Sequence, residues 1–380
     1  MKCGVYVHIP FCRAKCDYCS FYSIPFDPRS ADSKDLLTTY INRIVDEIVS
    51  FATIHDNCTI DTIYFGGGTP SLVDAAHLSA ILATIRNAFQ VTDECEITIE
   101  CNPEDCTFET ISSLVDIGAN RITLGVQNVF SSFRSHIGRA SNADVMRALE
   151  IFFSVDGFIR CVDYIVGIPG QTGILLRNEL RYIIQYSPQH ISAYLFTVEP
   201  GSPYHVRHTA PIDFDDTQLS LFDEAIDMFS AFEYTQYEIS NFARDGFQSR
   251  HNSKYWNWEP YLGFGAGAHS FFNGIRWHNP TDVFGYINAA ESILDNRSIG
   301  HQKAEYVLCV LRRSDGLSFQ NFSSTFHTCI PDHMMNAIDR HCSMGTLERR
   351  HKEGDSTIRL TRAGIHVMDS VVYDLTEGFL

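Results

Sequence analysis

Short apolar segments and longer amphipathic segments alternate along the first two hundred residues of the chain. The short segments are rich in β-branched and aromatic residues and are bounded by Gly, Pro or Asn, so they predict β-strands. The predicted strands are Val5–Ile9, Thr62–Phe65, Glu96–Glu100, Arg121–Val126, Ile159–Ile165 and His190–Val198.

The longer segments between these strands predict amphipathic helices over about residues 37–48, 75–89, 108–117, 142–152 and 175–186. In the first of them, one helical stripe carries Leu37, Tyr40, Ile41, Ile44, Val45 and Ile48. Six β-then-α units in succession predict a parallel sheet with right-handed crossovers. We therefore expect an α/β fold whose sheet is open or curled into an incomplete (β/α)6 barrel.

The pattern changes after about residue 200. Residues 1–210 hold the βα alternation, and residues 211–300 form an aromatic-rich connecting region that starts with a predicted helix over 213–232. Residues 301–380 start a new pattern of an apolar helix, a hairpin-like segment and a terminal helix. This last part is expected to be a smaller C-terminal α+β domain of the winged-helix kind.

Composition narrows the classes of function. The formal net charge is −17, which argues against nucleic acid or an anionic membrane as the main partner. No apolar run reaches the roughly 18 residues of a membrane span, and the segment Met1–Phe11 lacks the features of a signal peptide. We therefore expect a cytoplasmic protein that does not span a membrane. In that compartment, the 12 cysteines indicate metal or redox chemistry before disulfides.

Three of the cysteines are closely spaced directly after the first predicted strand. Cys12, Cys16 and Cys19 follow a C-x3-C-x2-C pattern. Three thiolates can hold three irons of a cubane [4Fe–4S] cluster and leave the fourth iron open for a methionine-like ligand. Zinc is the alternative, although a tetrahedral site would require a fourth nearby Cys or His. The other nine cysteines are scattered and are expected to be small buried residues or inert thiols.

The sequence around these cysteines adds a resemblance. Tyr6-Val-His-Ile-Pro-Phe-Cys12-Arg-Ala-Lys-Cys16-Asp-Tyr-Cys19 resembles the radical S-adenosylmethionine superfamily, in the branch that contains the anaerobic coproporphyrinogen III oxidases and the HemW-type heme chaperones. The resemblance covers essentially the whole chain. It implies a radical-SAM partial barrel that carries a [4Fe–4S] cluster with S-adenosylmethionine on the open iron.

Further candidate residues lie at the ends of the predicted strands, where the loops of such a barrel converge. The Gly-rich turn after the second strand contains Gly67, Gly68 and Thr69, which in the resembling family contact the methionine end of S-adenosylmethionine. The resemblance likewise implies that Glu100, Gln127, Arg139 and Asp163 bind the rest of that molecule and that Tyr6 stacks near the cluster. No residue is assigned a catalytic role.

Three features separate the two kinds of relative. The oxidases carry a fourth cysteine where this chain has Phe21, and they carry a long N-terminal extension where Tyr6 lies near the start here. His251-Asn-Ser-Lys-Tyr-Trp256 resembles a motif associated with heme in the chaperones, which makes His251 the candidate iron ligand. His269, in a second segment typical of that branch, is a further candidate without a spacing argument.

The interpretation is a heme chaperone that binds heme, the cluster and S-adenosylmethionine and delivers heme to an acceptor protein. The resemblance implies a membrane-bound respiratory acceptor and admits a homodimer. The first alternative is an oxygen-independent coproporphyrinogen III dehydrogenase that acts through a 5′-deoxyadenosyl radical. The second is a radical enzyme that uses the aromatic-rich region for another flat ligand.

Overall fold

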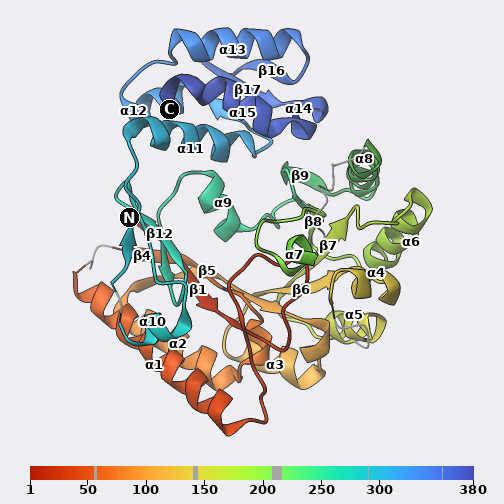
Figure 1. Cartoon of the computed structure of the whole chain (residues 1–380), viewed down its shortest axis with the longest axis vertical. Coiled ribbons are helices and arrows are strands. Elements are labelled where there is room, and N and C mark those ends of the chain that lie inside the picture. The colour runs from red at the N-terminus through yellow and green to blue at the C-terminus, as the bar shows by residue number, and fades with distance from the viewer. Residues whose placement is uncertain (55–57, 140–143, 208–215, 290, 353) are drawn as a thin grey trace.

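The computed structural model describes residues 1–54, 58–139, 144–207, 216–289, 291–352 and 354–380. A large sheet with its helices forms the main body, and a small α+β unit lies at the other end of the molecule, where α13 and the C-terminus are found (Figure 1).

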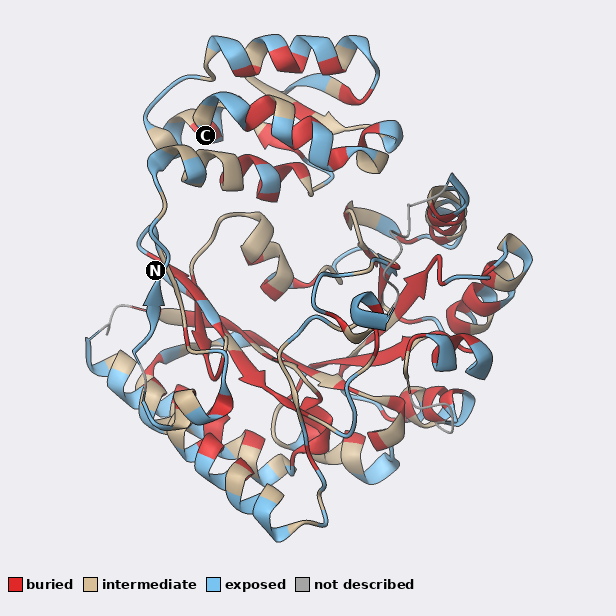
Figure 2. Cartoon of the chain, viewed as in Figure 1, coloured by how far each residue is buried: buried red, intermediate tan, exposed pale blue. Residues whose placement is uncertain are grey.

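Six parallel strands form the centre of the large sheet and confirm the six predicted strands. They lie side by side in sequence order and are β1 (Lys2–Ile9), β4 (Thr59–Gly67), β5 (Gln90–Cys101), β6 (Arg121–Gln127), β7 (Ile159–Val166) and β8 (His190–Leu195). These strands are buried on both faces, as parallel strands usually are (Figure 2). The expected α/β fold is confirmed, with an open sheet rather than a closed barrel among the described residues.

The predicted helices pack against one face of this sheet and present their polar sides outward (Figures 1 and 2). They are α1 (Ala31–Ile54), α2 (Ala75–Ala88), α3 (Phe108–Asp116), α5 (Val145–Ser154), α6 (Gly173–Ile184) and α8 (Asp216–Ala231), and the short α4 (Ser131–His136) follows β6. Five of the six stripe residues of α1 are buried, and Val45 is half-buried. The predicted starts of two helices, residues 142–143 and 213–215, lie outside the described residues.

The region expected to connect two domains contributes six further strands to the same sheet. At one edge, β10 (Asn241–Ala243) and β9 (Thr235–Glu238) continue antiparallel beyond β8. At the other edge, β11 (Tyr261–Phe264) runs parallel to β1 and is followed by β12 (His269–Phe272), β13 (Ile275–His278) and β14 (Ile293–Leu294). Strands of two to four residues show too little alternation to be predicted. The expected boundary at residue 210 lies outside the described residues.

Residues 299–380 form a three-stranded sheet with its own apolar core. The helices are α11 (Ile299–Leu311), α12 (Phe319–Phe326), α13 (Asp332–Ser343), α14 (Arg362–His366) and α15 (Met368–Thr376), and the strands are β15 (Leu317–Ser318), β16 (Leu347–Lys352) and β17 (Asp355–Leu360). Three helices that precede a β-hairpin are compatible with the winged-helix prediction. The remaining elements are the pair β2 (Phe11–Cys12) and β3 (Ile24–Pro25) and the short helices α7 (Pro203–Arg207), α9 (Arg250–Trp256) and α10 (Val283–Ile287).

Candidate cluster and cofactor site

The cysteine loop leaves the carboxyl end of β1 and is held by residues from distant parts of the chain. The backbone N–H of Asp17 donates to the carbonyl of Ile137 at 2.9 Å, and the carbonyl of Asp17 accepts from the N–H of Tyr204 at 2.8 Å. Arg13 forms an ion pair with the buried Asp105 at 2.5 Å. These contacts involve only protein atoms and fix the backbone of the loop. The three cysteines are therefore already positioned before a cluster binds.

The three cysteines of the loop are half-buried, whereas seven of the other nine are buried, Cys342 is half-buried and Cys329 is exposed. Seven of the scattered cysteines are thus small buried residues, as expected, and the inertness of Cys329 and Cys342 stays a prediction. Among the described residues, no three His, Cys, Asp or Glu side chains are gathered closely enough to hold one metal ion. A cubane does not need such a group, because each of its thiolates binds a different iron.

The surrounding protein favours the protonated form of two thiols of the loop, those of Cys12 and Cys19. Burial raises the pKa of Cys19 to about 11 and also raises the pKa of Cys12. Because thiolates and not thiols bind iron, loading a cluster must release these protons. The sulfur atoms have polar neighbours that suit an anion: Thr69 Oγ1 donates to Cys12 Sγ at 3.6 Å, and Arg139 donates to Cys16 Sγ at 3.5 Å.

The Gly-rich turn after β4 packs directly against the start of the cysteine loop. The N–H of Gly68 donates to the carbonyl of Ile9 at 2.8 Å, and the N–H of Thr69 donates to the carbonyl of Phe11 at 2.9 Å. A Cβ on Gly68 would lie 2.6 Å from the oxygen of Ile9, so only glycine permits this approach. The turn therefore positions the cysteine loop, in addition to its predicted contacts with S-adenosylmethionine.

Asn102 connects the Gly-rich turn to Arg139, and the sequence interpretation did not assign it a role. Its amide nitrogen donates to Thr69 Oγ1 at 2.8 Å, while its oxygen accepts from the Arg139 guanidinium at 2.5 Å. The same guanidinium donates to the carbonyl of Gly125 at 3.0 Å, and the Gln127 amide lies beside Gly125. The structure thus brings the Gly-rich turn, the end of β6 and Arg139 together around Asn102. In the sequence, only the position of Asn102 directly after β5 pointed to this residue.

Two carboxylates, Glu100 on β5 and Asp163 on β7, lie near each other in the concave side of the sheet. Burial raises the pKa of Glu100 to about 7, the nearby Asp163 charge adds to this, and a hydrogen bond from Tyr64 at 2.7 Å opposes it. Burial likewise raises the pKa of Asp163 to about 6. The ring of Tyr6 stacks on Tyr64 with centroids 6.1 Å apart, so it borders the same space.

The predicted heme motif forms α9, which lies on the side of the sheet opposite α1 and α2 (Figure 1). His251 is fully buried, and both of its ring nitrogens are hydrogen-bonded: Nδ1 to Thr62 Oγ1 at 2.9 Å and Nε2 to Tyr255 Oη at 2.8 Å. Burial lowers the pKa of His251 to about 3. Heme iron would reach this imidazole only if one of the two hydrogen bonds were broken. His251 as the iron ligand therefore remains a prediction.

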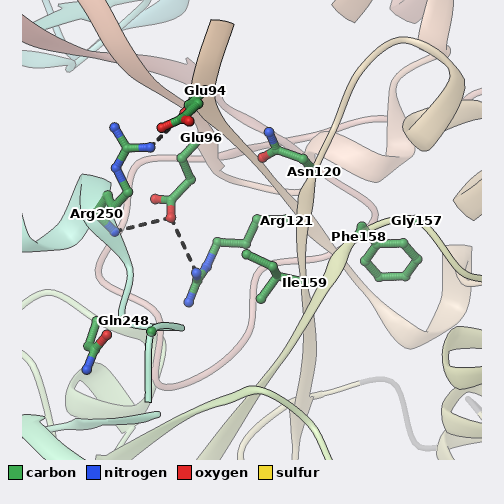
Figure 3. Close-up of a pocket in the computed structure, with 10 residues that line it drawn as sticks. Glu94, Glu96, Asn120, Arg121, Gly157, Phe158, Ile159, Gln248 and Arg250 are labelled. Atoms are coloured by element: carbon green, nitrogen blue, oxygen red, sulfur yellow. Dashed lines mark hydrogen bonds and ion pairs between the residues drawn. The ribbon is translucent and has the colours of Figure 1, made fainter. Parts of the chain in front are cut away.

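Other residues of α9 are also used to attach the helix to the sheet. Lys254 is buried and forms ion pairs with Asp61 at 2.9 Å and with Glu259 at 3.1 Å. The Glu96 carboxylate accepts from the N–H of His251 at 2.9 Å. It also accepts from the N–H of Arg250 at 3.2 Å and from the buried Arg121 at 3.3 Å (Figure 3). The first N–H groups of a helix have no partner within the helix, so a carboxylate at the helix start stabilises them.

A cavity of about 470 Å³ adjoins Glu96, Arg121 and Arg250 (Figure 3). Its lining residues come from β5, from the amino ends of β6 and β7 and from the segment that leads into α9, at the opposite end of the sheet from the cysteine loop. None of the predicted site residues lines it, so we do not connect it with the cluster or with S-adenosylmethionine.

Comparisons with known proteins agree with this arrangement. Residues 6–181 match the model of the Radical SAM superfamily. The heme chaperone HemW of Lactococcus lactis is 31% identical over 85% of this chain and 85% of its own length, and the HemW of Bacillus subtilis is 29% identical over 85% and 86%. The chain belongs to the HemW family.

A solved structure shows the same fold. The coproporphyrinogen III oxidase HemN of Escherichia coli superposes with a TM-score of 0.81 over 98% of this chain and 89% of that chain, at 18% sequence identity. At this identity the similarity establishes the fold, while the family assignment rests on the HemW relatives. Within the described part of this HemW-family chain, no helix combines the length and apolar character needed to cross a bilayer.

The site fits the cofactors that the radical-SAM assignment of a HemW-family chain implies. S-adenosylmethionine carries a sulfonium, an ammonium and a carboxylate group. The concave side of the sheet offers two carboxylates, Glu100 and Asp163, and one guanidinium, Arg139, which complement these charges. Burial raises the pKa of both carboxyl groups, and the nearby Asp163 charge raises the pKa of Glu100 further, so a cationic ligand would favour their charged forms.

Proposed function

We propose that this chain is a heme chaperone that binds heme and a [4Fe–4S] cluster with S-adenosylmethionine and transfers the heme to an acceptor protein. The observation that carries this proposal is the 31% identity to a protein named heme chaperone over 85% of both chains. The half-buried C-x3-C-x2-C loop and the paired carboxylates in the concave side of the sheet support it.

For the cofactor site we propose the following roles. Cys12, Cys16 and Cys19 would hold three irons, and the cluster would supply single electrons when it is bound. Arg139 would pair with the carboxylate of S-adenosylmethionine while it donates to Cys16, and Glu100 and Asp163 would face its hydroxyl and cationic groups. Gly67, Gly68, Thr69, Gln127 and Tyr6 would complete the contacts.

The acceptor is proposed from the resemblance to the heme chaperones rather than from a site in this structure. A membrane-bound respiratory enzyme is the kind of acceptor that we propose, with the carrier itself in the cytoplasm. A homodimer is compatible with this function. We also propose the division into residues 1–210, 211–300 and 301–380, with the aromatic-rich middle part extending the sheet on both edges.

The release of protons when S-adenosylmethionine binds tests the proposed role of Glu100. Because the pKa of Glu100 is about 7, about half of these carboxyl groups carry a proton near pH 7. The cationic groups of S-adenosylmethionine favour the carboxylate, so binding at pH 7 should release about half a proton from Glu100 per molecule bound. This adds to the proton that the amino group of the ligand loses when it binds the open iron. Calorimetric titration of the cluster-loaded protein in buffers with different ionisation enthalpies measures this number. Glu100→Gln should lower the number of protons released by about half a proton per molecule bound. An unchanged number in this variant would contradict the assignment of Glu100.

The dehydrogenase alternative is favoured by one observation, the shared fold with the HemN oxidase. Anaerobic incubation of the cluster-loaded protein with coproporphyrinogen III, S-adenosylmethionine and a reductant separates the two functions. The proposal predicts no protoporphyrinogen, together with saturable heme binding in a parallel sample. Conversion of coproporphyrinogen, with no saturable heme binding, would replace the chaperone by the enzyme.

A further inference from the structure

Two histidines lie directly opposite each other on neighbouring strands at one edge of the large sheet. His269 of β12 pairs with His278 of β13, and their ring centroids are 4.9 Å apart with an angle of 33° between the ring planes. His269 is exposed and His278 is half-buried. Opposite residues of an antiparallel pair point to the same face, so both imidazoles are offered on one surface.

Hydrogen bonding leaves ring nitrogens of this pair open. Nδ1 of His278 lies 3.0 Å from the carbonyl oxygen of Asn279 and must donate to it, since that oxygen can only accept. This bond selects the tautomer whose lone pair is on Nε2, the arrangement usual for metal-binding histidines. Neither ring nitrogen of His269 makes a hydrogen bond within the part of the chain that the structure describes.

The surface around the histidine pair has side chains that suit a porphyrin, which is a flat apolar macrocycle with two anionic propionates. Ile293 of β14 lies opposite His278 with 51% of its surface exposed, which places an aliphatic side chain on the same face. Arg276 lies two residues before His278 and therefore also on that face, where it packs over the ring of Phe271 at 5.7 Å. A porphyrin needs apolar contacts and cationic partners for its two propionates. Arg276 forms an ion pair with Glu305 at 2.5 Å, so a propionate would take the place of Glu305 there.

We propose that the His269–His278 pair provides the axial ligand of heme iron, with Nε2 of His278 as the donor that is already oriented. The inference rests on the proposed heme-chaperone function and names the ligand for it. An accessible ligand also suits a carrier that must release its heme. By contrast, the fully buried His251 has both nitrogens occupied by Thr62 and Tyr255.

The test compares heme titrations of the full-length, cluster-loaded protein, followed by its Soret absorbance and by electron paramagnetic resonance of the ferric form. We expect His278→Ala to change the ligand-field signature of the heme iron. The double variant His269→Ala/His278→Ala should lose the histidine-ligated spectrum, and its affinity for heme should fall by about tenfold or more. Metal-free protoporphyrin should bind to the double variant as it does to the unaltered protein. His327→Asn, at an exposed position with left-handed backbone, is the matched control and should change nothing.

The outcomes separate this inference from the function on which it rests. If the unaltered protein binds no heme, the chaperone function itself fails. If the unaltered protein binds heme and the double variant shows the same spectrum and affinity, only the ligand assignment is overturned, and loss of the signature in His251→Gln would then return the ligand to α9. Far-ultraviolet circular dichroism of each variant verifies that the fold is retained.

Discussion

Cys16→Ser is expected to abolish the iron–sulfur cluster. Two remaining thiolates cannot hold a cubane, and a serine hydroxyl is a far weaker iron ligand than a thiolate. The substitution also removes the sulfur that accepts from Arg139 at 3.5 Å. Iron and acid-labile sulfide, determined after anaerobic reconstitution, should fall from about four of each per chain to near zero, and the brown absorbance should disappear.

Cys329→Ser is the matched control, because Cys329 is an exposed thiol outside the loop. It should reconstitute as fully as the unaltered protein. Retention of a full cluster in Cys16→Ser, or an equal loss in both variants, would contradict the assignment of the three loop cysteines.

Glu96→Ala is expected to lower the free energy of unfolding by about 3–5 kcal/mol, the usual cost of removing one partner of a buried ion pair. The Glu96 carboxylate is buried and receives hydrogen bonds from Arg121 and from the first N–H groups of α9 (Figure 3). Its loss leaves the Arg121 guanidinium, itself only 2% exposed, without a counter-ion. Urea unfolding followed by circular dichroism measures the change.

Glu233→Ala provides the comparison, because Glu233 faces Arg244 at 3.7 Å with 88% of its side chain exposed. Its effect on the free energy of unfolding should be below about 0.5 kcal/mol. Equal effects of the two substitutions would show that the Glu96–Arg121 pair does not hold α9 on the sheet.

The sequence was sufficient for the central sheet and for the place of the cysteine loop. Parallel strands that are buried on both faces appear as continuous apolar segments, so β1 and β4 to β8 could be predicted. Likewise, Glu100 and Arg139 could be assigned to one site, because the carboxyl ends of parallel strands meet at one edge of a sheet.

Other features depend on contacts between distant residues and could not be read from local patterns. The edge strands β9 to β14 are too short to show a period. The H-N-x-x-Y-W segment gave no sign that His251 is enclosed by Thr62 of β4, 189 residues away. The cross-strand pairing of His269 with His278 required the register of two strands whose existence was not predicted.

The central claim, a heme carrier on a radical-SAM fold, is tested most directly by an anaerobic heme titration of the protein with and without its reconstituted cluster. We predict saturable binding of one heme per chain in the cluster-loaded protein, with cluster absorbance and heme absorbance present together. Heme absorbance that rises without saturation in both samples, as for heme adsorbed non-specifically, would contradict the account.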